Sequence, residues 1–385
     1  MHNNKNTLLT RTILFIQFIL FFGTAMPNAI NNHEVQAIIL AAGQGSRLKT
    51  GITKLITPIC GQPMVLYTVA LMQKLSIPTT IVIGYQKELV QQAIESANIP
   101  NLLFAKQAEQ LGTGHALLCS KETWHANNIL VMNGDMPLIT PDIITQLCLE
   151  HQKNNAAISI VTSYNVDPAN AFGRIVQQGD SIKIVEKKHF TFSITDYPYV
   201  NAGIYLINRA FLETFLSTIK QNEKTNEFYI TDLVEIASNH QLPVITMPFP
   251  FELLNGVNTF EELATVEQIK RNELIHYWMA NGIRFTAPHT VHLDLNATIG
   301  RGTVINAGVQ LLNNTKIGEF CTIHPHAVLD NATLENKVIV GAQSVIENVI
   351  IKEGTTLPAF SYGARNKFMH YQTPAHYSQK NDVTL

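Results

Sequence analysis

The chain has 385 residues, of which 46% are hydrophobic and 15% are charged, and its formal net charge at pH 7 is −2. That length suffices for two domains with sizeable cores, and the apolar content excludes disorder over most of the chain. A near-neutral balance lacks the basic surface that binds nucleic acid, so we expect no nucleic-acid partner. The four cysteines, Cys60, Cys119, Cys148 and Cys321, have neither CxxC nor zinc-site spacing, which favours reduced thiols.

Residues 1–34 form an N-terminal extension in which Lys5 and Arg11 precede an apolar run at residues 13–22. This order resembles the n- and h-regions of a signal peptide, but the run is shorter than the roughly 20 residues that a spanning helix needs. The cleavage pattern is poor, and Met26 stands just before the first domain. We expect a signal-like segment, a loose anchor or a misassigned start, with membrane contact only if the apolar stretch is retained.

Residues 35–260 alternate apolar runs with amphipathic stretches, and helical patterns lie between the runs at Met64–Lys74 and Lys87–Ser96. This alternation predicts an α/β fold, a Rossmann-like domain with a mostly parallel sheet. Ligands of such sheets bind beyond the carboxyl ends of the strands, so functional motifs should directly follow strands. Strands are predicted at residues 37–40, 80–83, 102–104, 129–132, 157–162 and 182–185.

The first motif after a strand reads AAGQGSR at residues 41–47. Its small residues let the backbone approach a ligand closely, and consecutive N–H groups in such a turn bind anions. Arg47 and Lys54 follow within reach, and both are cations suited to phosphate. The motif indicates a bound nucleoside triphosphate, with an ordinary glycine-rich strand–helix turn as the alternative. The predicted nucleotide contacts are Leu40, Ala41, Ala42, Gly43 and Gly45.

A second motif, QAEQLGTGHA at residues 107–116, combines amide, hydroxyl and small residues. The edge of a nucleotide base offers donors and acceptors, which amide side chains and backbone groups can match. We predict nucleotide contacts at Gln107, Gly112 and Thr113, with a glycine-capped helix start as the alternative. We interpret His115 as a structural helix residue rather than a catalytic base.

A third motif, NGDMPL at residues 133–138, directly follows the predicted strand at 129–132. A carboxylate at a strand end beside a phosphate loop is a suitable Mg²⁺ ligand, because Mg²⁺ prefers hard oxygen donors and keeps substrate phosphates in its shell. Asp135 is therefore a candidate metal ligand, and a turn aspartate is the alternative.

Residues 283–357 carry an internal repeat, in which aliphatic residues recur at every sixth position from Leu293 to Leu329. The register slips by one at Leu334 and resumes at Val340 and Ile346. A period of six fits a parallel β-helix with three short faces per coil, each repeat burying one aliphatic residue. We expect fewer than four coils.

A helical pattern at Glu261–Met279 lies between the two domains, and we assign residues 261–282 to a linker helix. Residues 358–385 read as a polar tail. The predicted organisation is therefore an extension, an α/β domain, a linker helix, a short β-helix and a tail.

These motifs together resemble one enzyme family. The segment LAAGQGSR followed by a lysine resembles the signature loop of the sugar-nucleotidyltransferases, although Thr53 stands where the family usually has proline. The segment QAEQLGTGHA resembles the uracil-reading segment of the bacterial N-acetylglucosamine-1-phosphate uridyltransferases. FGRI, VEKK, NAGI, EFYITD and GVN then follow in the order of those enzymes. The six-residue repeat resembles the left-handed β-helix of the bifunctional uridyltransferase/acetyltransferase.

The resemblance implies a UDP-N-acetylglucosamine diphosphorylase of cell wall precursor synthesis. Such an enzyme transfers UMP from UTP to N-acetylglucosamine 1-phosphate with release of pyrophosphate. The resemblance implies that Arg47 and Lys54 are catalytic and that Asp135 and Asn258 hold Mg²⁺. Because export would separate the enzyme from UTP, we expect a cytoplasmic protein. The implied contacts to the amino sugar are Gly173, Glu186 and Asn201.

Besides Thr53, two more residues depart from the family pattern: Ala202 replaces a usual threonine or serine, and Asn133 replaces a frequent aromatic residue. Two alternatives stay open, the second of which is suggested by Thr53, Asn133, Ala202 and the short repeat. One is a uridylyl- or thymidylyltransferase for another sugar 1-phosphate, and the other is a catalytically silent regulator that binds sugar nucleotides.

The β-helix also implies a homo-oligomer, a trimer in the family. The repeat here is short, so we expect weaker self-association, with Ile283, Phe285 and the outer aliphatic residues offering apolar surface. The acetyltransferase site of the bifunctional relatives lies on further coils, which we expect this protein to lack, so we expect no acetyl transfer.

Overall fold

The computed structural model describes residues 34–45, 48, 51–170, 172–364 and 367–370. Arg47 and residues 1–33 lie outside this range, so the predictions for them are not addressed. The chain divides into two compact units, of which the first extends to Val266 and the second contains Ile59–Gln62 together with the residues from Glu267 onward. Within the described ranges, no helix is long and apolar enough to cross a membrane.

Among the described residues, the first unit is built on a nine-stranded sheet that contains the order β11-β7-β10-β6-β1-β4-β5. Its centre is β1 (Val35–Ala41), which pairs in parallel with β4 (Thr79–Ile83) and with β6 (Asn128–Asn133). Beyond β4 lies β5 (Leu102–Lys106), also parallel. The mostly parallel sheet predicted from the apolar runs is confirmed, because β1, β4 and the interior of β6 are buried as such strands require.

One strand that the sequence pattern did not predict is β10 (Tyr199–Asn208), which lies between β6 and β7 (Ile158–Tyr164) and runs antiparallel to both. Its pairing with β7 shifts between Asn201 and Tyr205, where Gly203 has φ +76°. This β-bulge breaks the alternation of side chains that would have revealed the strand.

Three further strands complete the sheet. Next to β7 lies β11 (Val244–Pro248), in parallel with it. A hairpin of β8 (Arg174–Gln178) and β9 (Ser181–Val185) joins the sheet through β10.

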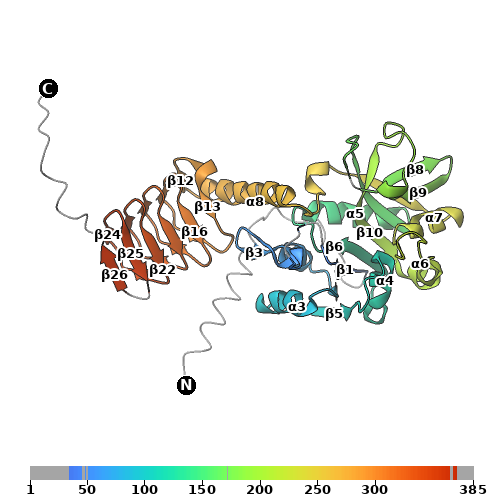
Figure 1. Ribbon diagram of the computed structural model, residues 1–385, viewed down its shortest axis with the longest axis horizontal. Helices are drawn as coiled ribbons and strands as arrows, with labels where there is room; N and C mark the ends of the chain where they lie inside the picture. Colours follow the sequence, from blue (N-terminus) through green and yellow to red (C-terminus); the bar gives the residue numbers. More distant parts are fainter. Residues whose placement is uncertain (1–33, 46–47, 49–50, 171, 365–366, 371–385) are drawn as a thin grey trace, which may run out of the picture. The chain divides into compact units, whose positions relative to one another are not determined.

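Helices cover both faces of the sheet (Figure 1), and the two faces have separate hydrophobic cores. Successive residues of β1 alternate between them, with Ile39 in one core and Ile38 in the other, as the pleat of a strand requires. The helices of the Ile39 face are α2 (Met64–Lys74), α3 (Lys87–Ser96) and α5 (Pro141–Lys153). Those of the Ile38 face are α4 (Thr113–Cys119), α6 (Arg209–Phe215) and α7 (Asp232–Asn239).

The boundary between the units falls within α8 (Phe260–Ala280), the helix predicted at Glu261–Met279. The second unit also includes the turn of a small hairpin between β2 (Pro58–Ile59) and β3 (Gln62–Pro63). In that unit the Leu295 N–H donates to the carbonyl oxygen of Cys60 at 2.9 Å. No sequence pattern links these two segments, which lie far apart along the chain.

The second unit is a parallel β-helix, confirming the fold predicted from the six-residue repeat. Its described strands form three ladders of five, six and four strands. They complete four coils and begin a fifth, so the expectation of fewer than four coils is wrong. Leu293, Leu311 and Leu329 stack in register, and each is 0% exposed. The strands are β12 (Arg284–Phe285), β13 (His292–Leu293), β14 (Thr298–Ile299), β15 (Val304–Ile305), β16 (Gln310–Leu312), β17 (Lys316–Ile317), β18 (Thr322–Ile323), β19 (Val328–Asp330), β20 (Thr333–Leu334), β21 (Ile339–Val340), β22 (Val345–Glu347), β23 (Ile350–Ile351), β24 (Thr356–Leu357), β25 (Ser361–Ala364) and β26 (Lys367–His370).

The slip at Leu334 reflects a shorter coil. Val304 pairs with Thr322, and Thr322 pairs with Ile339, one residue sooner. The missing residue falls in a turn, so the inward position of Leu334 is kept, at 2% exposure.

The strands continue into the predicted polar tail. β25 pairs in parallel with β22 and antiparallel with β26. The repeat pattern missed β25 because Gly363 takes the ladder position next to Ile346, where an aliphatic residue was required.

The expectation that Ile283 and Phe285 offer apolar surface is wrong. They are 4% and 7% exposed, and Phe285 pairs with Ile305 in a ladder of the β-helix. Exposed apolar side chains of this unit do include Ile350, at 59% exposure, and Phe320, at 55%.

His151 of α5 is a buried titratable group of the first unit, with 2% exposure. Its Nδ1 lies 2.9 Å from Ser159 Oγ, and its Nε2 lies 3.1 Å from Asn128 Oδ1. An amide oxygen only accepts, so Nε2 carries the proton and Nδ1 accepts from the serine hydroxyl. Burial lowers the pKa of His151 from 6.5 to about 4.

We predict that the first unit loses stability as the pH falls from 6.5 towards 4. In this window His151 is protonated in the unfolded chain but neutral in the folded one, so protons favour unfolding. The loss should be on the order of 2 kcal/mol in the free energy of unfolding. Denaturant titrations at pH 7 and pH 4.5 measure it. His151→Gln is the control, because it removes this titration while all other groups still titrate. The free energy of unfolding should therefore fall less with pH in the variant, and an equal fall in variant and wild type would contradict the assignment.

Candidate active site

The candidate site begins where β1 and β6 end. Leu40 is the register partner of Asn133, and the Leu40 carbonyl accepts a hydrogen bond from the Gly134 N–H at 3.0 Å. Parallel strands in this register deliver the segments that follow them to the same edge of the sheet. The Ala41–Gly45 segment and Asp135 therefore leave the sheet side by side, as the sequence predicted.

Lys54 lies at the meeting point of three segments. Its Nζ donates to the Asp135 carboxylate, to the Val257 carbonyl oxygen at 2.9 Å and to Asn258 Oδ1 at 2.7 Å. The side chains of Lys54 and Asp135 are 13% and 15% exposed. Three of the predicted site residues, Lys54, Asp135 and Asn258, thus converge on one partly buried ammonium.

The loop that carries Asn258 is fixed by backbone contacts. The Val257 N–H donates to the Asp135 carbonyl at 3.0 Å. Gly256 permits this approach, because a Cβ there would lie 3.2 Å from Asp135 Oδ1. The amide nitrogen of Asn258 donates to the Gly256 carbonyl at 3.2 Å, which turns the amide oxygen towards Lys54.

The start of α8 anchors the other side of Asn258. The Glu262 carboxylate accepts from the N–H groups of Asn258, at 2.6 Å, and Thr259, at 2.9 Å, and Thr259 Oγ1 accepts from the Glu262 N–H at 3.1 Å. This reciprocal pair is a capping box, readable in the sequence as T-x-x-E. It was not singled out there, and it positions a predicted metal ligand.

Asp135 and Asn258 fit the Mg²⁺ assignment, because both bind a cation in the structure. Both direct an oxygen at the same compact cation, the Lys54 ammonium, which stands in for a metal ion. Hard oxygen donors of this kind suit Mg²⁺. Within the described residues, no group of three or more His, Cys, Asp or Glu side chains could hold a metal. Mg²⁺ commonly keeps phosphate and water among its ligands.

The phosphate-loop glycines differ in their surroundings. Gly45 has φ +61°, and a Cβ there would lie 2.9 Å from Lys54 Cγ. Gly43 has no described atom within 4 Å of the corresponding position and leaves open space. Gly45 thus lets the loop approach the lysine stem closely, whereas a Cβ on Gly43 would meet no described atom. Arg47, the second predicted cation, lies outside the described residues.

The second motif is folded tightly onto itself. Gln107 follows β5 and is 3% exposed, and its amide nitrogen donates to the Gly112 carbonyl at 3.0 Å. The same nitrogen lies 3.1 Å from His115 Nδ1 in α4, which agrees with a structural role for the histidine. The helix start that was named as the alternative is present, since α4 begins at Thr113, directly after Gly112.

This motif also docks on residues 227–230. Gly112 has φ +98°, and a Cβ there would lie 2.5 Å from the Phe228 carbonyl oxygen. Thr113 Oγ1 accepts from the Ile230 N–H at 3.1 Å. Glycine and threonine at these positions are therefore explained by protein contacts.

Gly84, which the sequence analysis did not single out, joins the first two motifs. A Cβ at Gly84 would lie 2.8 Å from Ala42 Cβ and 2.9 Å from Gln110 Nε2. The Ala42 carbonyl also accepts from the Tyr85 N–H at 3.0 Å. Gly84 directly follows β4, and a glycine at the carboxyl end of a central parallel strand was the available signal.

The predicted sugar contacts also come together. The Gly173 carbonyl accepts from the Asn201 N–H at 2.8 Å, and a Cβ on Gly173 would lie 3.5 Å from Glu186 Oε2. Asn201 Nδ2 donates to Tyr205 Oη at 2.6 Å. Asn133, at the end of β6, approaches this group through Gly203, whose Cβ would lie 3.1 Å from Asn133 Nδ2. The bulge in β10 therefore links the phosphate edge to the predicted sugar side.

The carboxylates of this side are partly desolvated. Burial raises the pKa of Glu186, whose Oε1 accepts from the Thr231 hydroxyl at 3.2 Å. Burial, followed by the charges of Glu235 and Glu186, raises the pKa of Asp232 to about 6. Perturbed carboxyl groups in one region are typical of functional sites.

Buried Arg174, which the sequence analysis did not select, supports these residues. It is 1% exposed, and its guanidinium donates to the carbonyl oxygens of Asn165, at 2.6 Å, and Tyr197, at 3.3 Å. It therefore ties two loops beside Gly173.

Comparison with known proteins agrees with this architecture. Residues 37–205 match the MobA-like NTP transferase domain, and residues 296–331 match the bacterial transferase hexapeptide (six repeats). The bifunctional protein GlmU of Clostridium botulinum (strain ATCC 19397 / Type A) is 32% identical over 331 residues, covering 85% of this chain and 71% of the relative. GlmU of Geotalea uraniireducens (strain Rf4) is 31% identical over 332 residues, covering 84% and 72%. The chain belongs to the GlmU family.

This GlmU-family chain is a sugar-1-phosphate nucleotidyltransferase, as the family and the matched transferase domain together indicate. Among solved structures, UDP-glucose pyrophosphorylase complexed with UDP-glucose matches with a TM-score of 0.48 and 20% identity, covering 62% of this chain and 99% of that one. A likeness at that level carries no argument about the substrate.

Alanine substitutions at three loop glycines should separate backbone strain from steric contact. We predict that Gly51→Ala costs about 1 kcal/mol of stability, because its φ of +70° is strained for alanine in otherwise open space. Gly45→Ala should cost more, since the new Cβ also meets Lys54. Gly43→Ala should cost least, because Gly43 does not have a strained positive φ and its new Cβ would meet no described atom. Denaturant unfolding measures the order, and an equal cost at Gly43 and Gly45 would contradict the assigned role of Gly45.

Proposed function

We propose that this protein is a UDP-N-acetylglucosamine diphosphorylase, which converts UTP and N-acetylglucosamine 1-phosphate into UDP-N-acetylglucosamine and pyrophosphate. The observation that carries the proposal is the convergence of Lys54, Asp135 and Asn258 beside the glycine loop that follows β1. Family membership and the order of the sequence motifs support the choice of substrates.

The reaction in this proposal is an in-line attack of a sugar-phosphate oxygen on the α-phosphorus of UTP. The nucleophile is already an anion, so neither a general base nor a covalent intermediate is needed. Catalysis then consists of positioning the two phosphates and neutralising their charge. The loop at Ala41–Gly45 supplies backbone N–H groups for the triphosphate, and Arg47 is assigned to the leaving pyrophosphate on sequence grounds alone.

Mg²⁺ held by Asp135 and Asn258 would supply charge neutralisation and orientation of the reacting phosphates. These two oxygens bind the Lys54 ammonium in the structure. In the proposed reaction, Lys54 leaves them and pairs with phosphate oxygens, where it stabilises the negative charge of the transition state. In the structure the lysine therefore binds protein oxygens close to where the substrate phosphates are proposed to bind.

Gln107 and Gly112 are assigned to the uracil, and Gly173, Glu186 and Asn201 to the amino sugar. Gln107 is already rigid in the structure, because its amide nitrogen is bound to Gly112. A rigid amide suits base reading, since less side-chain entropy is lost on binding.

Pyrophosphate release from UTP in the presence of Mg²⁺, measured across several sugar 1-phosphates, tests the proposal. N-acetylglucosamine 1-phosphate should be the preferred acceptor. A higher kcat/KM with another sugar, or with dTTP, would replace the proposed substrate. Binding of UTP without pyrophosphate release for any acceptor would favour the silent regulator.

We predict that Asp135→Ala lowers kcat by roughly 10²-fold or more, the usual cost of losing one electrostatic stabiliser of the transition state. Asn258→Ala should cost less, because a neutral ligand is lost. The pyrophosphate-release assay compares both at saturating substrates over a Mg²⁺ series. Near-normal turnover of Asp135→Ala at ordinary Mg²⁺ would refute the metal assignment.

We also predict no acetyl-CoA-dependent acetylation of glucosamine 1-phosphate. Incubation of the purified protein with both compounds, followed by titration of free CoA thiol, checks this. CoA formed above background in proportion to enzyme concentration would show that a transferase site is present.

A further inference from the structure

Gln86 has an unusual backbone conformation beside the candidate active site. It immediately precedes α3 and has φ 47° and ψ 42°, in the left-handed region that glutamine rarely adopts. A strained residue persists only where its surroundings fix it, and such residues gather at functional sites.

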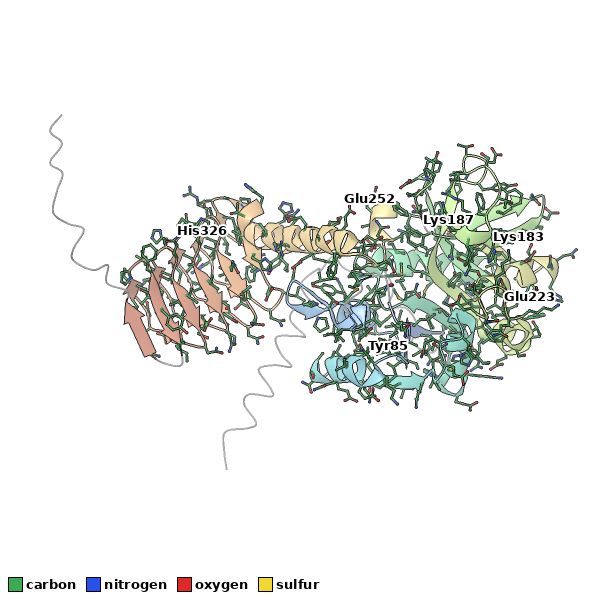
Figure 2. All side chains as sticks on the ribbon, viewed as in Figure 1. Tyr85, Lys183, Lys187, Glu223, Glu252 and His326 are labelled. Carbon is green, nitrogen blue, oxygen red and sulfur yellow. The ribbon has the colours of Figure 1, made fainter. Side chains whose placement is uncertain are left out.

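The Gln86 side chain does not serve its own helix. Residues in this position commonly cap the helix that they precede, but among the described residues Gln86 makes no side-chain cap. Instead, its Oε1 accepts from the Thr53 N–H at 2.7 Å, and its Nε2 donates to the Gly51 carbonyl at 2.9 Å. The neighbouring Tyr85, labelled in Figure 2, donates from Oη to the same carbonyl at 3.4 Å.

These bonds act on the residue directly before Lys54. Thr53 is 0% exposed, and its buried Oγ1 has no hydrogen-bond partner among the described residues. The Thr53 side chain therefore gains nothing from a polar contact, and its backbone N–H is held by Gln86. The next residue begins a short 3-10 helix (Lys54–Ile56), whose direction sets where the Lys54 ammonium can reach.

We propose that Gln86 is a positioning residue for Lys54. It clamps Gly51 and Thr53 and thereby fixes the backbone at Lys54. From there the side chain reaches the oxygens of Asp135, Val257 and Asn258 in the structure and the phosphates in the proposed reaction. The inference rests on the proposed function, because Lys54 has its catalytic role only in that reaction.

Three variants test the proposal. Gln86→Gly removes both hydrogen bonds and relieves the strained φ, so the fold is kept. Its matched control is Gln241→Gly, because Gln241 also has a left-handed φ, of +56°, and lies between α7 and β11, where the site has no member. The rescue variant is Thr53→Pro in the Gln86→Gly background. Thr53 has φ −58°, which suits proline, and proline has no N–H that needs an acceptor.

Pyrophosphate release gives the first readout. Gln86→Gly should lower kcat roughly tenfold or more, the usual effect of losing a supporting contact. Its melting temperature should not fall, and Gln241→Gly should keep wild-type kcat. Thr53→Pro should restore much of the lost kcat. A wild-type kcat in Gln86→Gly would overturn the proposal. So would a loss of kcat that is accompanied by a lower melting temperature and is not restored by Thr53→Pro.

Labelling of Lys54 by an amine-acylating reagent, followed by mass spectrometry, gives a readout that needs no activity. The Lys54 side chain is 13% exposed, so the rate should rise several-fold in Gln86→Gly and return with Thr53→Pro. If the wild type is inactive but Lys54 labelling changes in this way, the proposed function is refuted and the positioning of Lys54 by Gln86 is supported. An active wild type with unchanged labelling in Gln86→Gly would overturn the clamp and keep the function.

Discussion

The first unit depends on one ammonium group held by oxygens from distant parts of the chain. Lys54 binds Asp135, which is 81 residues away, and Asn258, which is 204 residues away. A positive charge this far from solvent is stable only when several oxygens surround it. The loops after β1 and β6, together with the start of α8, must therefore meet at one point. The register of β1 with β6 makes that meeting possible.

The surroundings of this point are shaped by the absence of side chains. A Cβ on Gly45, Gly84 or Gly256 would press on Lys54, Ala42 or Asp135. Each glycine thus removes atoms where two loops must approach closely. The site therefore depends on these glycines as well as on its charged groups. Its polar atoms can form hydrogen bonds because the glycines let the backbones approach each other.

Features that depend on local repetition could be predicted from the sequence. The β-helix was read from its period, since Leu293, Leu311 and Leu329 bury identical groups at equal spacing. Strands such as β1 were read from apolar runs that both faces of the sheet require. The segments holding Lys54 and Asp135 were also found, because each has a chemical signature, and Asn258 was found through the family resemblance. The resemblance also implied that Asp135 and Asn258 share one ligand. Their contact with the Lys54 ammonium was not predicted, since no local pattern records a contact between residues that lie far apart.

The features that sequence analysis missed share a physical cause. β10 was hidden by a bulge at Gly203, and Arg174 is a buried arginine at the start of β8, a strand that the sequence analysis did not predict. Gln86 is the sharpest case, because nothing in its neighbourhood indicates a left-handed backbone. In the β-helix, left-handed residues such as Asn331 and Asn348 recur at corners, and each coil supports the next, with their side chains 2.7 Å apart. Gln86 has no such repetition around it. Its strain is balanced by hydrogen bonds to a loop 33 residues earlier, so its conformation follows from what it holds rather than from its own sequence.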